Sequence, residues 1–211
     1  DGLQRSIEIR LRQKQPKQIN LDSSPIARMA DLMGCLNAVL LSPEDLRLVK
    51  DGPGERRRFL DRELSQIKPG YFAQLSAFAR VHAQRNALLK SIAAGRGQPT
   101  ALDPWDAQFA QYGAELVSDR RKFLRQLRDV AAITQGRISE NREALSLSYD
   151  ADVQPAHEGE SDDDALASML CAQREDDIRR GLTQRGPQRD DIRIRLDGRD
   201  ARLYASQGQQ R

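Results

Sequence analysis

The feature that most restricts the fold is the stretch 43–142, in which no strand pattern occurs and apolar residues recur at helical spacing. Two long helical patterns, 69–94 and 103–135, are separated only by a short segment with glycine and proline. Two long helices joined by a short loop pack against each other as an antiparallel hairpin. The sequence therefore predicts a helical lobe built around such a hairpin.

Apolar side chains mark the inner face of both predicted helices. They are Tyr71, Leu75, Phe78, Val81, Leu88 and Ile92 in the first, and Trp105, Phe109, Tyr112, Leu116, Phe123, Leu127 and Val130 in the second. In the second helix the steps of three, four and seven resemble a coiled-coil seam, interrupted near Asp119. Trp105 begins this seam, so we assign it to the core; stacking on nucleobases is the alternative.

Strand patterns flank the helical lobe on its N-terminal side. Residues 6–12 alternate apolar and polar side chains, and 17–21 is a second short strand that can pair with them. A short helix is expected over 26–36, and the apolar run 38–41 is expected to be a buried strand.

Strand patterns also follow the lobe. We expect a strand at 145–149, an acidic mobile loop at 151–163, a helix at 165–181 that ends at a glycine, and a hairpin of 191–196 with 202–204 around Asp197-Gly198. The fold class is α+β and mostly helical. The predicted division is a partial sheet domain over 1–42, the helical lobe over 43–142, and a return to the sheet domain over 143–211, which ends in the hairpin and terminal segment 191–211.

The composition excludes several functional classes. Hydrophobic residues make up 38% and charged residues 31% of the chain, and no run approaches the roughly 18 apolar residues of a membrane span. We expect no membrane contact and a cytoplasmic location. Cys35 and Cys171 have no metal-ligand spacing, and with only His82 and His157 neither a zinc site nor a catalytic Cys/His or Ser/His/Asp set is expected. We therefore predict no metal site and no catalytic residues of its own.

Clustered arginines are the first candidate functional residues. The formal net charge is only +3, but the basic residues are mostly Arg, which suits phosphate and carboxylate acceptors. Arg121, Arg125 and Arg128 lie at i, i+4 and i+7 on one helix face, and Lys122 is beside them. Such a stripe can follow a DNA backbone. The alternative is a solvated face paired with Glu115, Asp119 and Asp129.

Three further groups of charged residues are candidates for a structural or a functional role. Arg56, Arg57 and Arg58 either pair with Asp61 and Glu63 or contact DNA or the edge of a nucleotide site. Glu44 and Asp45 follow Ser42-Pro43, a helix-start pattern, and can serve as capping residues. Asp190 and Asp191 are expected to pair with Arg189 and Arg193 in preference to holding a metal.

The segment 205–211 reads Ala-Ser-Gln-Gly-Gln-Gln-Arg. A serine and a glycine after a strand and before an expected helix form an anion-binding corner of backbone amides, a hydroxyl and a helix dipole. An ordinary loop is the alternative.

This segment resembles the signature motif of ABC-type ATPases, and the chain as a whole resembles the RecF family of bacterial recombinational repair. The supporting stretches are LSPEDL (41–46), ERRRFLD (55–61), QRNALLK (84–90), WD (105–106), GPQRDD (186–191) and SQGQQR (206–211). They follow the order of the family across nearly the whole chain, and six matches in order are far more specific than one.

The resemblance implies an SMC-like, ABC-type ATPase head with a helical second lobe inserted into it. It implies ATP and Mg as cofactors of the intact protein, an ATP-dependent homodimer, and binding to double-stranded and gapped DNA. RecO and RecR would be partners in loading RecA onto single strands, in replication-fork maintenance and the SOS response. Ser206, Gly208 and Gln209 would contact in trans the terminal phosphate of ATP held by the other subunit, and Glu44 and Asp45 would lie where the head joins the lobe.

The sequence departs from the family pattern in two respects. The glycine-rich phosphate loop and the acidic Walker B strand are not among the 211 residues, so the chain alone is expected neither to bind nor to hydrolyse ATP. Because the chain begins with Asp1 in a predicted strand and ends where a helix should start, we expect both ends to be cut from a longer protein. Gln188 replaces the usual His of the family. A rival reading makes the lobe a docking module for a partner such as RecR, with no DNA binding of its own.

Overall fold

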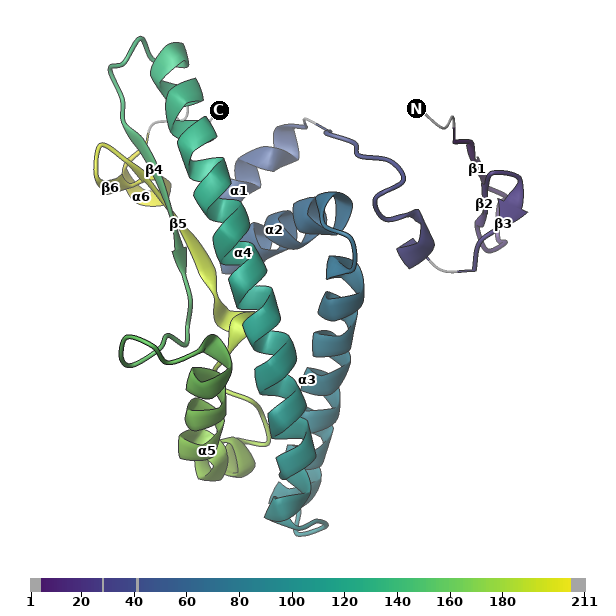
Figure 1. Cartoon of the computed structure of the whole chain (residues 1–211), viewed down its shortest axis with the longest axis vertical. Helices are drawn as coiled ribbons and strands as arrows, with labels where there is room; N and C mark the ends of the chain where they lie inside the picture. The colour runs from purple at the N-terminus through teal and green to yellow at the C-terminus, as the bar shows by residue number, and fades with distance from the viewer. Residues whose placement is uncertain (1–4, 28, 41, 206–211) are drawn as a thin grey trace.

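The computed structural model describes residues 5–27, 29–40 and 42–205, and its central feature is a helix hairpin. Helices α3 (Tyr71–Ala93) and α4 (Asp103–Ile138) lie side by side and are joined by a short connection with the 3-10 turn Pro99–Leu102 (Figure 1). Gly95 ends α3 in a left-handed conformation at φ 71°, which lets Arg96 donate back to the carbonyl of Ser91. The predicted hairpin is confirmed.

The main core lies where α5 (Asp162–Arg180) packs against both helices of the hairpin. Its buried members include Leu64, Tyr71, Phe78, Val81, Phe109, Leu116, Leu166 and Leu170. Trp105 packs against this cluster, as the sequence predicts. Helix α2 (Pro53–Ile67) crosses the hairpin near the start of α3.

A small antiparallel sheet covers α4 on its other side. Its strand order is β4 (Leu145–Asp150), β5 (Asp191–Leu196) and β6 (Arg199–Asp200). The apolar face of β4 and β5 packs on α2 and α4 through Leu60 and Leu124. The turn at Asp197-Gly198 is confirmed, and both residues have positive φ.

The second arm of that hairpin differs from the prediction. Residues 202–204, expected as a strand, belong to the short helix α6 (Ala201–Tyr204). The carboxylate of Asp200 accepts the backbone N–H of Arg202 at 2.8 Å and so caps the helix, which ends the strand after two residues.

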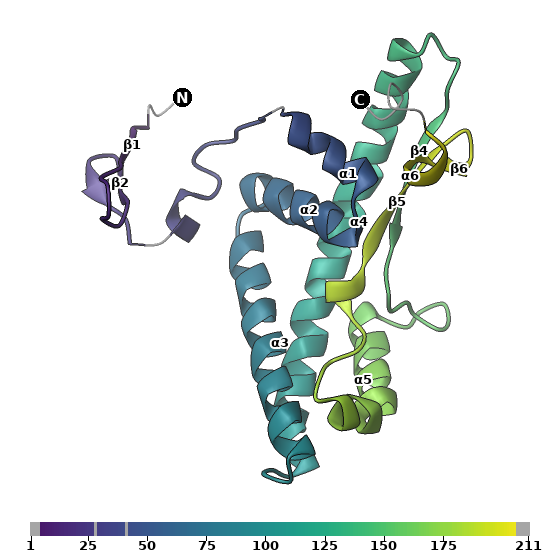
Figure 2. The ribbon, with the colours of Figure 1, turned by 180° about the vertical axis from the view of Figure 1, so that it is seen from behind.

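A second antiparallel sheet at the N-terminal side consists of β1 (Ile7–Arg10), β2 (Gln18–Leu21) and β3 (Ser24–Pro25). The pairing of the first two strands agrees with the prediction. In both views this sheet stands apart from the hairpin (Figures 1 and 2). It is joined to α2 through the 3-10 turns Met29–Leu32 and Pro43–Leu46 and helix α1 (Arg47–Lys50).

Two expectations for this linking segment are wrong. The helix expected over 26–36 is only the four-residue 3-10 turn, followed by Gly34 at φ 80°. Residues 38–40 form no strand, and Val39 and Leu40 are 87% and 80% exposed. A buried strand needs neighbours that pair with its backbone and cover its side chains, and no described strand supplies them here.

Candidate nucleic-acid interface

The basic stripe on α4 divides into one engaged arginine and three exposed cations. The Arg121 guanidinium is half-buried and donates two hydrogen bonds, of 2.8 and 3.1 Å, to the carboxylate of Asp162 at the start of α5. Lys122, Arg125 and Arg128 are exposed. The helix therefore presents three basic side chains to solvent within two turns, and a fourth that is bound to a carboxylate.

Of the acidic partners expected for a solvated face, Asp119 is bound elsewhere and Asp129 pairs with the stripe. Asp119 is buried and binds Lys68 at 2.5 Å. Arg128 does pair with Asp129, at 3.0 Å, but both side chains are more than half exposed. Within the described part of the chain, Lys122 and Arg125 make no ion pair. Exposed pairs of this kind contribute little to stability, so much of the stripe's charge remains available.

A buried arginine fixes α4 beneath the stripe. Arg120 donates to both carboxylate oxygens of Asp61 at 2.9 and 3.0 Å and to the carbonyl of Pro187 at 3.0 Å. Tyr71 donates to the same carboxylate at 2.6 Å. Burial alone would lower the pKa of Arg120, but Tyr71 and Asp61 raise it overall. Burial raises the pKa of Tyr71. Arg120 is thus a permanently charged anchor that holds α4 to α2 and to the turn before β5.

Asp190 is a second buried charged group at the start of β5. Its carboxylate accepts hydrogen bonds from the hydroxyl of Tyr149 and, at 2.8 Å, from the backbone N–H of Asp152. The same carboxylate lies 3.7 Å from the guanidinium of Arg120. Burial raises the pKa of Asp190 to about 6, despite these hydrogen bonds. Burial, together with the charge of Asp190, also raises the pKa of Tyr149.

The expected pairing of these aspartates with Arg189 and Arg193 is wrong. Asp191 binds Arg56, with contacts of 2.6 and 3.0 Å, and Arg193 binds Asp150 at 2.8 Å. Within the described ranges, no three His, Cys, Asp or Glu side chains are grouped as a metal site. These carboxylates join elements of the fold.

Arg56 and Arg57 are both engaged inside the molecule. Arg56 is buried and also donates to the carbonyls of Leu48 and Asp51. Arg57 is half-buried and donates to the carbonyl of Asp190 at 2.7 Å, and burial lowers its pKa. Internal ion pairing is thus observed for this cluster, and Arg58 binds its neighbour Glu55. Asp61 and Glu63, the other acidic residues expected as partners, bind Arg120 and Arg62 instead.

The other sequence candidates are placed as follows. Asp45 accepts the backbone N–H of Ser42 at 2.7 Å, which is a capping contact at the entry to α1. The side chain of Glu44 lies outside what the structure describes, as do Ser206, Gly208 and Gln209.

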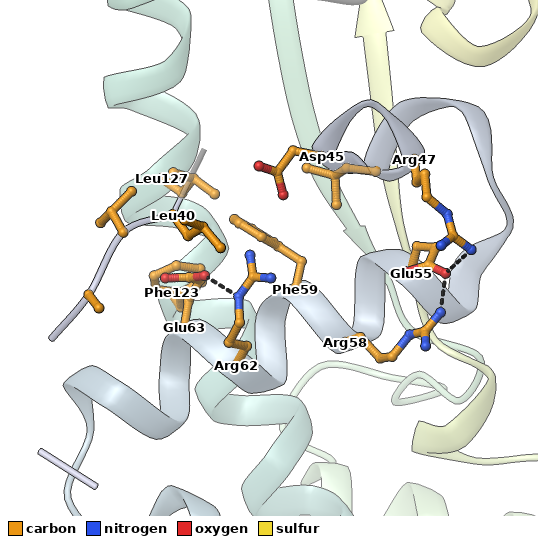
Figure 3. A pocket seen from close by; sticks show the side chains of 13 residues that line it. Leu40, Asp45, Arg47, Glu55, Arg58, Phe59, Arg62, Glu63, Phe123 and Leu127 are labelled. Carbon is orange, nitrogen blue, oxygen red and sulfur yellow. Dashed lines mark hydrogen bonds and ion pairs between the residues drawn. The ribbon is translucent and has the colours of Figure 1, made fainter. Parts of the chain in front are cut away.

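Sequence reasoning missed an open groove of about 850 Å³ between α2, α4 and the linking segment (Figure 3). Phe59, Phe123, Leu127 and Leu40 form its apolar wall. Its rim is charged: Arg62 binds Glu63 at 2.9 Å, and Glu55 is shared by Arg47 and Arg58. The seam spacing predicts Phe123 and Leu127 as core positions, but it does not reveal that they line an open groove in the described structure.

A buried charge cluster between α3, α4 and α5 also escaped prediction. The fully buried Arg85 donates to Asp106 and Asp177, each at 2.7 Å, and to the hydroxyl of Thr183 at 2.8 Å. Arg174 reaches the other oxygen of Asp106 at 2.6 Å. Periodicity assigned the neighbouring positions to the core, but it cannot identify which charged residues meet there.

Comparison with known proteins gives the family context. No protein-family model matches the chain. The DNA replication and repair protein RecF of Alkaliphilus oremlandii is 39% identical over 207 residues, which cover 97% of this chain and 56% of that protein. The protein of the same name from Halothermothrix orenii is 39% identical over 215 residues, which cover all of this chain and 56% of that protein.

Solved structures agree with the sequence comparison. A structure of the recombination mediator protein RecF-ATPrS in the RecFOR pathway matches with a TM-score of 0.89 and 29% identity, covering 98% of this chain and 56% of that one. A structure of RecF-ATP in the same pathway matches with a TM-score of 0.88 and 29% identity. The predicted fold class, a mostly helical α+β lobe of an ABC-type ATPase fold, is confirmed. In the described part of the chain no helix is both long enough and apolar enough to cross a membrane. By sequence and by fold the chain belongs to the RecF family, and it spans a little more than half the length of the relatives that it matches.

Proposed function

We propose that this chain acts in recombinational gap repair and replication-fork maintenance, as part of a RecF-type protein that binds DNA in an ATP-dependent manner and helps to load RecA onto single strands. The names of the relatives, DNA replication and repair protein RecF, support a role in repair. The solved relatives, described as RecF with ATP or ATPrS in the RecFOR pathway, support ATP as a cofactor and RecO and RecR as partners.

In this proposal the exposed face of α4 contacts the phosphates of duplex or gapped DNA. The observation that carries it is the exposure of Lys122, Arg125 and Arg128 on one rigid helix, two of them without an ion pair among the described residues. Phosphate contacts of this kind are independent of sequence and depend on salt. Arg56 and Arg57, also candidates by sequence, are engaged inside the fold and do not enter the proposed surface.

The nucleotide part of the proposal concerns the signature segment. Ser206, Gly208 and Gln209 would contact the terminal phosphate of an ATP held, with its Mg, by a second subunit in a cytoplasmic homodimer. Glu44 and Asp45 would connect that site to the helical lobe. The resemblance of SQGQQR to an ABC signature supports this arrangement.

Fluorescence anisotropy with a labelled duplex that carries a single-stranded tail tests the DNA contact. We expect the Arg121→Ala/Arg125→Ala/Arg128→Ala variant to bind at least about tenfold more weakly than the native chain at low salt, because three phosphate contacts are removed. The matched control is Arg96→Ala/Arg179→Ala/Arg180→Ala, which removes the same charge from exposed positions in the loop after α3 and in the last turn of α5. Equal losses in the two triple variants would contradict a specific surface on α4.

The alternative function is protein docking without DNA binding. The groove beside Phe59 and Phe123 favours it, since an apolar wall with a charged rim is typical of a protein contact. Under this alternative, DNA does not bind the native chain at low salt. A partner such as RecR binds with only a mild dependence on salt, and DNA does not compete with it.

A further inference from the structure

The ion pair between Arg121 and Asp162 joins the proposed DNA surface to a different helix. Asp162 is the first residue of α5. Its two carboxylate oxygens accept hydrogen bonds of 2.8 and 3.1 Å from the two terminal nitrogens of Arg121. This is the paired geometry in which an arginine also binds two oxygens of a phosphate. In this structure the guanidinium edge that could bind a phosphate is therefore occupied by a carboxylate of the same chain.

The pair is built so that it can open. The side chain of Arg121 is 36% exposed and that of Asp162 is 16% exposed, so solvent and an incoming anion reach the contact. Partly exposed ion pairs contribute little to stability, so opening this one carries only a small penalty. The neighbouring Arg120 offers a contrast: its side chain is 4% exposed and bound to Asp61, so phosphate cannot reach it.

The surroundings of Asp162 strengthen its negative field. Asp163 and Asp164 follow it in the first turn of α5, both exposed, and Glu160 precedes it. Asp164 is held by Ser161, the N-cap residue, and Glu160 accepts the backbone N–H of Ala156. Of this acidic turn, only Asp162 makes a contact with the basic stripe among the described residues.

We propose that the first turn of α5 is an autoinhibitory element, in which Asp162 masks Arg121 and DNA phosphate must displace it to complete the contact with α4. This inference rests on the proposed DNA contact of α4. Its consequence is that the resting molecule offers Lys122, Arg125 and Arg128 first, and Arg121 joins only when α5 gives up the pair. The ion pair with Asp162 lowers the affinity of α4 for any polyanion. A shift of α5 that breaks this pair therefore raises that affinity.

The test compares Asp162→Asn with Asp163→Asn by anisotropy on the same tailed duplex. Both variants remove one negative charge from the same helical turn, but only the first releases Arg121, because Asp163 makes no ion pair within the described residues. We expect Asp162→Asn to bind the duplex about three- to tenfold more tightly than Asp163→Asn at low salt. The slope of log K against log salt should also be steeper by about one for Asp162→Asn. Thermal melting of both variants checks that α5 remains folded.

An Arg121→Ala background completes the design. There the two Asn variants should bind equally, because no arginine remains to be released. Equal binding of the two variants in the native background, including no binding by either, would overturn the masking proposal, as would a gain that persists without Arg121. The DNA contact itself is judged separately, by the loss in the Arg121/Arg125/Arg128 triple variant relative to its control, so the two proposals can fail independently.

Discussion

At the scale of single residues, the two most informative side chains are buried and charged. Arg120 and Asp190 lie 3.7 Å apart, and each is held by partners from other elements. Arg120 stays charged under all conditions in which the protein is folded. Asp190 is different, because burial brings its pKa to about 6, within reach of ordinary buffers.

Asp190 gives the native chain a component of stability that decreases as pH rises. Its folded pKa of about 6 is above the ordinary value of 3.8, so the native state binds a proton that the unfolded state has released between these values. This contribution is complete below pH 3.8 and lost through pH 6, a change of about 3 kcal/mol. Urea unfolding at several pH values should show the native chain losing stability relative to Asp190→Asn over this window. A difference independent of pH would show that Asp190 is ionised throughout.

At the scale of elements, the Arg85 cluster determines how α5 sits on the hairpin. Arg85 belongs to α3, Asp106 to α4, Asp177 to α5, and Thr183 to the turn that follows. Thr183 in turn bonds Asn86 of α3 at 2.7 Å. Three helices are thus joined by one buried guanidinium, and the position of Asp162 at the other end of α5 depends on this attachment.

Removing this guanidinium should lower the free energy of unfolding substantially. Arg85→Ala leaves two buried carboxylates without their shared cation, so we expect a loss of about 3–5 kcal/mol in the free energy of unfolding. Arg80→Ala is the matched control, an exposed arginine on the same helix, and should change the stability by less than about 0.5 kcal/mol. Chemical denaturation measures both. Similar values for the two would mean that α5 is held by its apolar contacts alone.

The helices and their order could be predicted from the sequence because their signals are local. Periodicity, Gly95 and Gly181 indicate α3, α4 and α5, because a glycine stop and an apolar face act within a few residues. The expected start of α5 is wrong, because the helix begins at Asp162, inside the stretch 151–163 that the sequence predicts as a loop. The run 38–41 could not be judged in this way. Whether an apolar run is buried depends on which other elements cover it, and the sequence of the run does not specify those elements.

The site shows the same division between local and distant causes. The stripe on α4 is visible in the sequence as a spacing, but the ion pair of Arg121 with Asp162 is not, because the two residues lie 41 positions apart. The sequence also placed Arg56 among the candidates for DNA contact, whereas its partner Asp191 lies 135 positions away in β5. Ion pairs between distant positions depend on the complete fold.

At the scale of the whole molecule, two surfaces face away from the core with different chemistry. One is the basic face of α4, and the other is the apolar groove with Val39 and Leu40 beside it. The chain spans a little more than half the length of its curated relatives. The proposed DNA contact belongs to the face of α4, and the docking alternative belongs to the groove.

The most direct test of the account is the salt dependence of DNA affinity for Lys122→Ala/Arg125→Ala, the two stripe cations without an ion pair among the described residues. If the face of α4 binds DNA, the slope of log K against log salt becomes shallower by about two, since each phosphate contact contributes about 0.9. The control variant Arg179→Ala/Arg180→Ala should retain the native slope. An unchanged slope in Lys122→Ala/Arg125→Ala, or an equal decrease in both variants, would contradict DNA binding by α4.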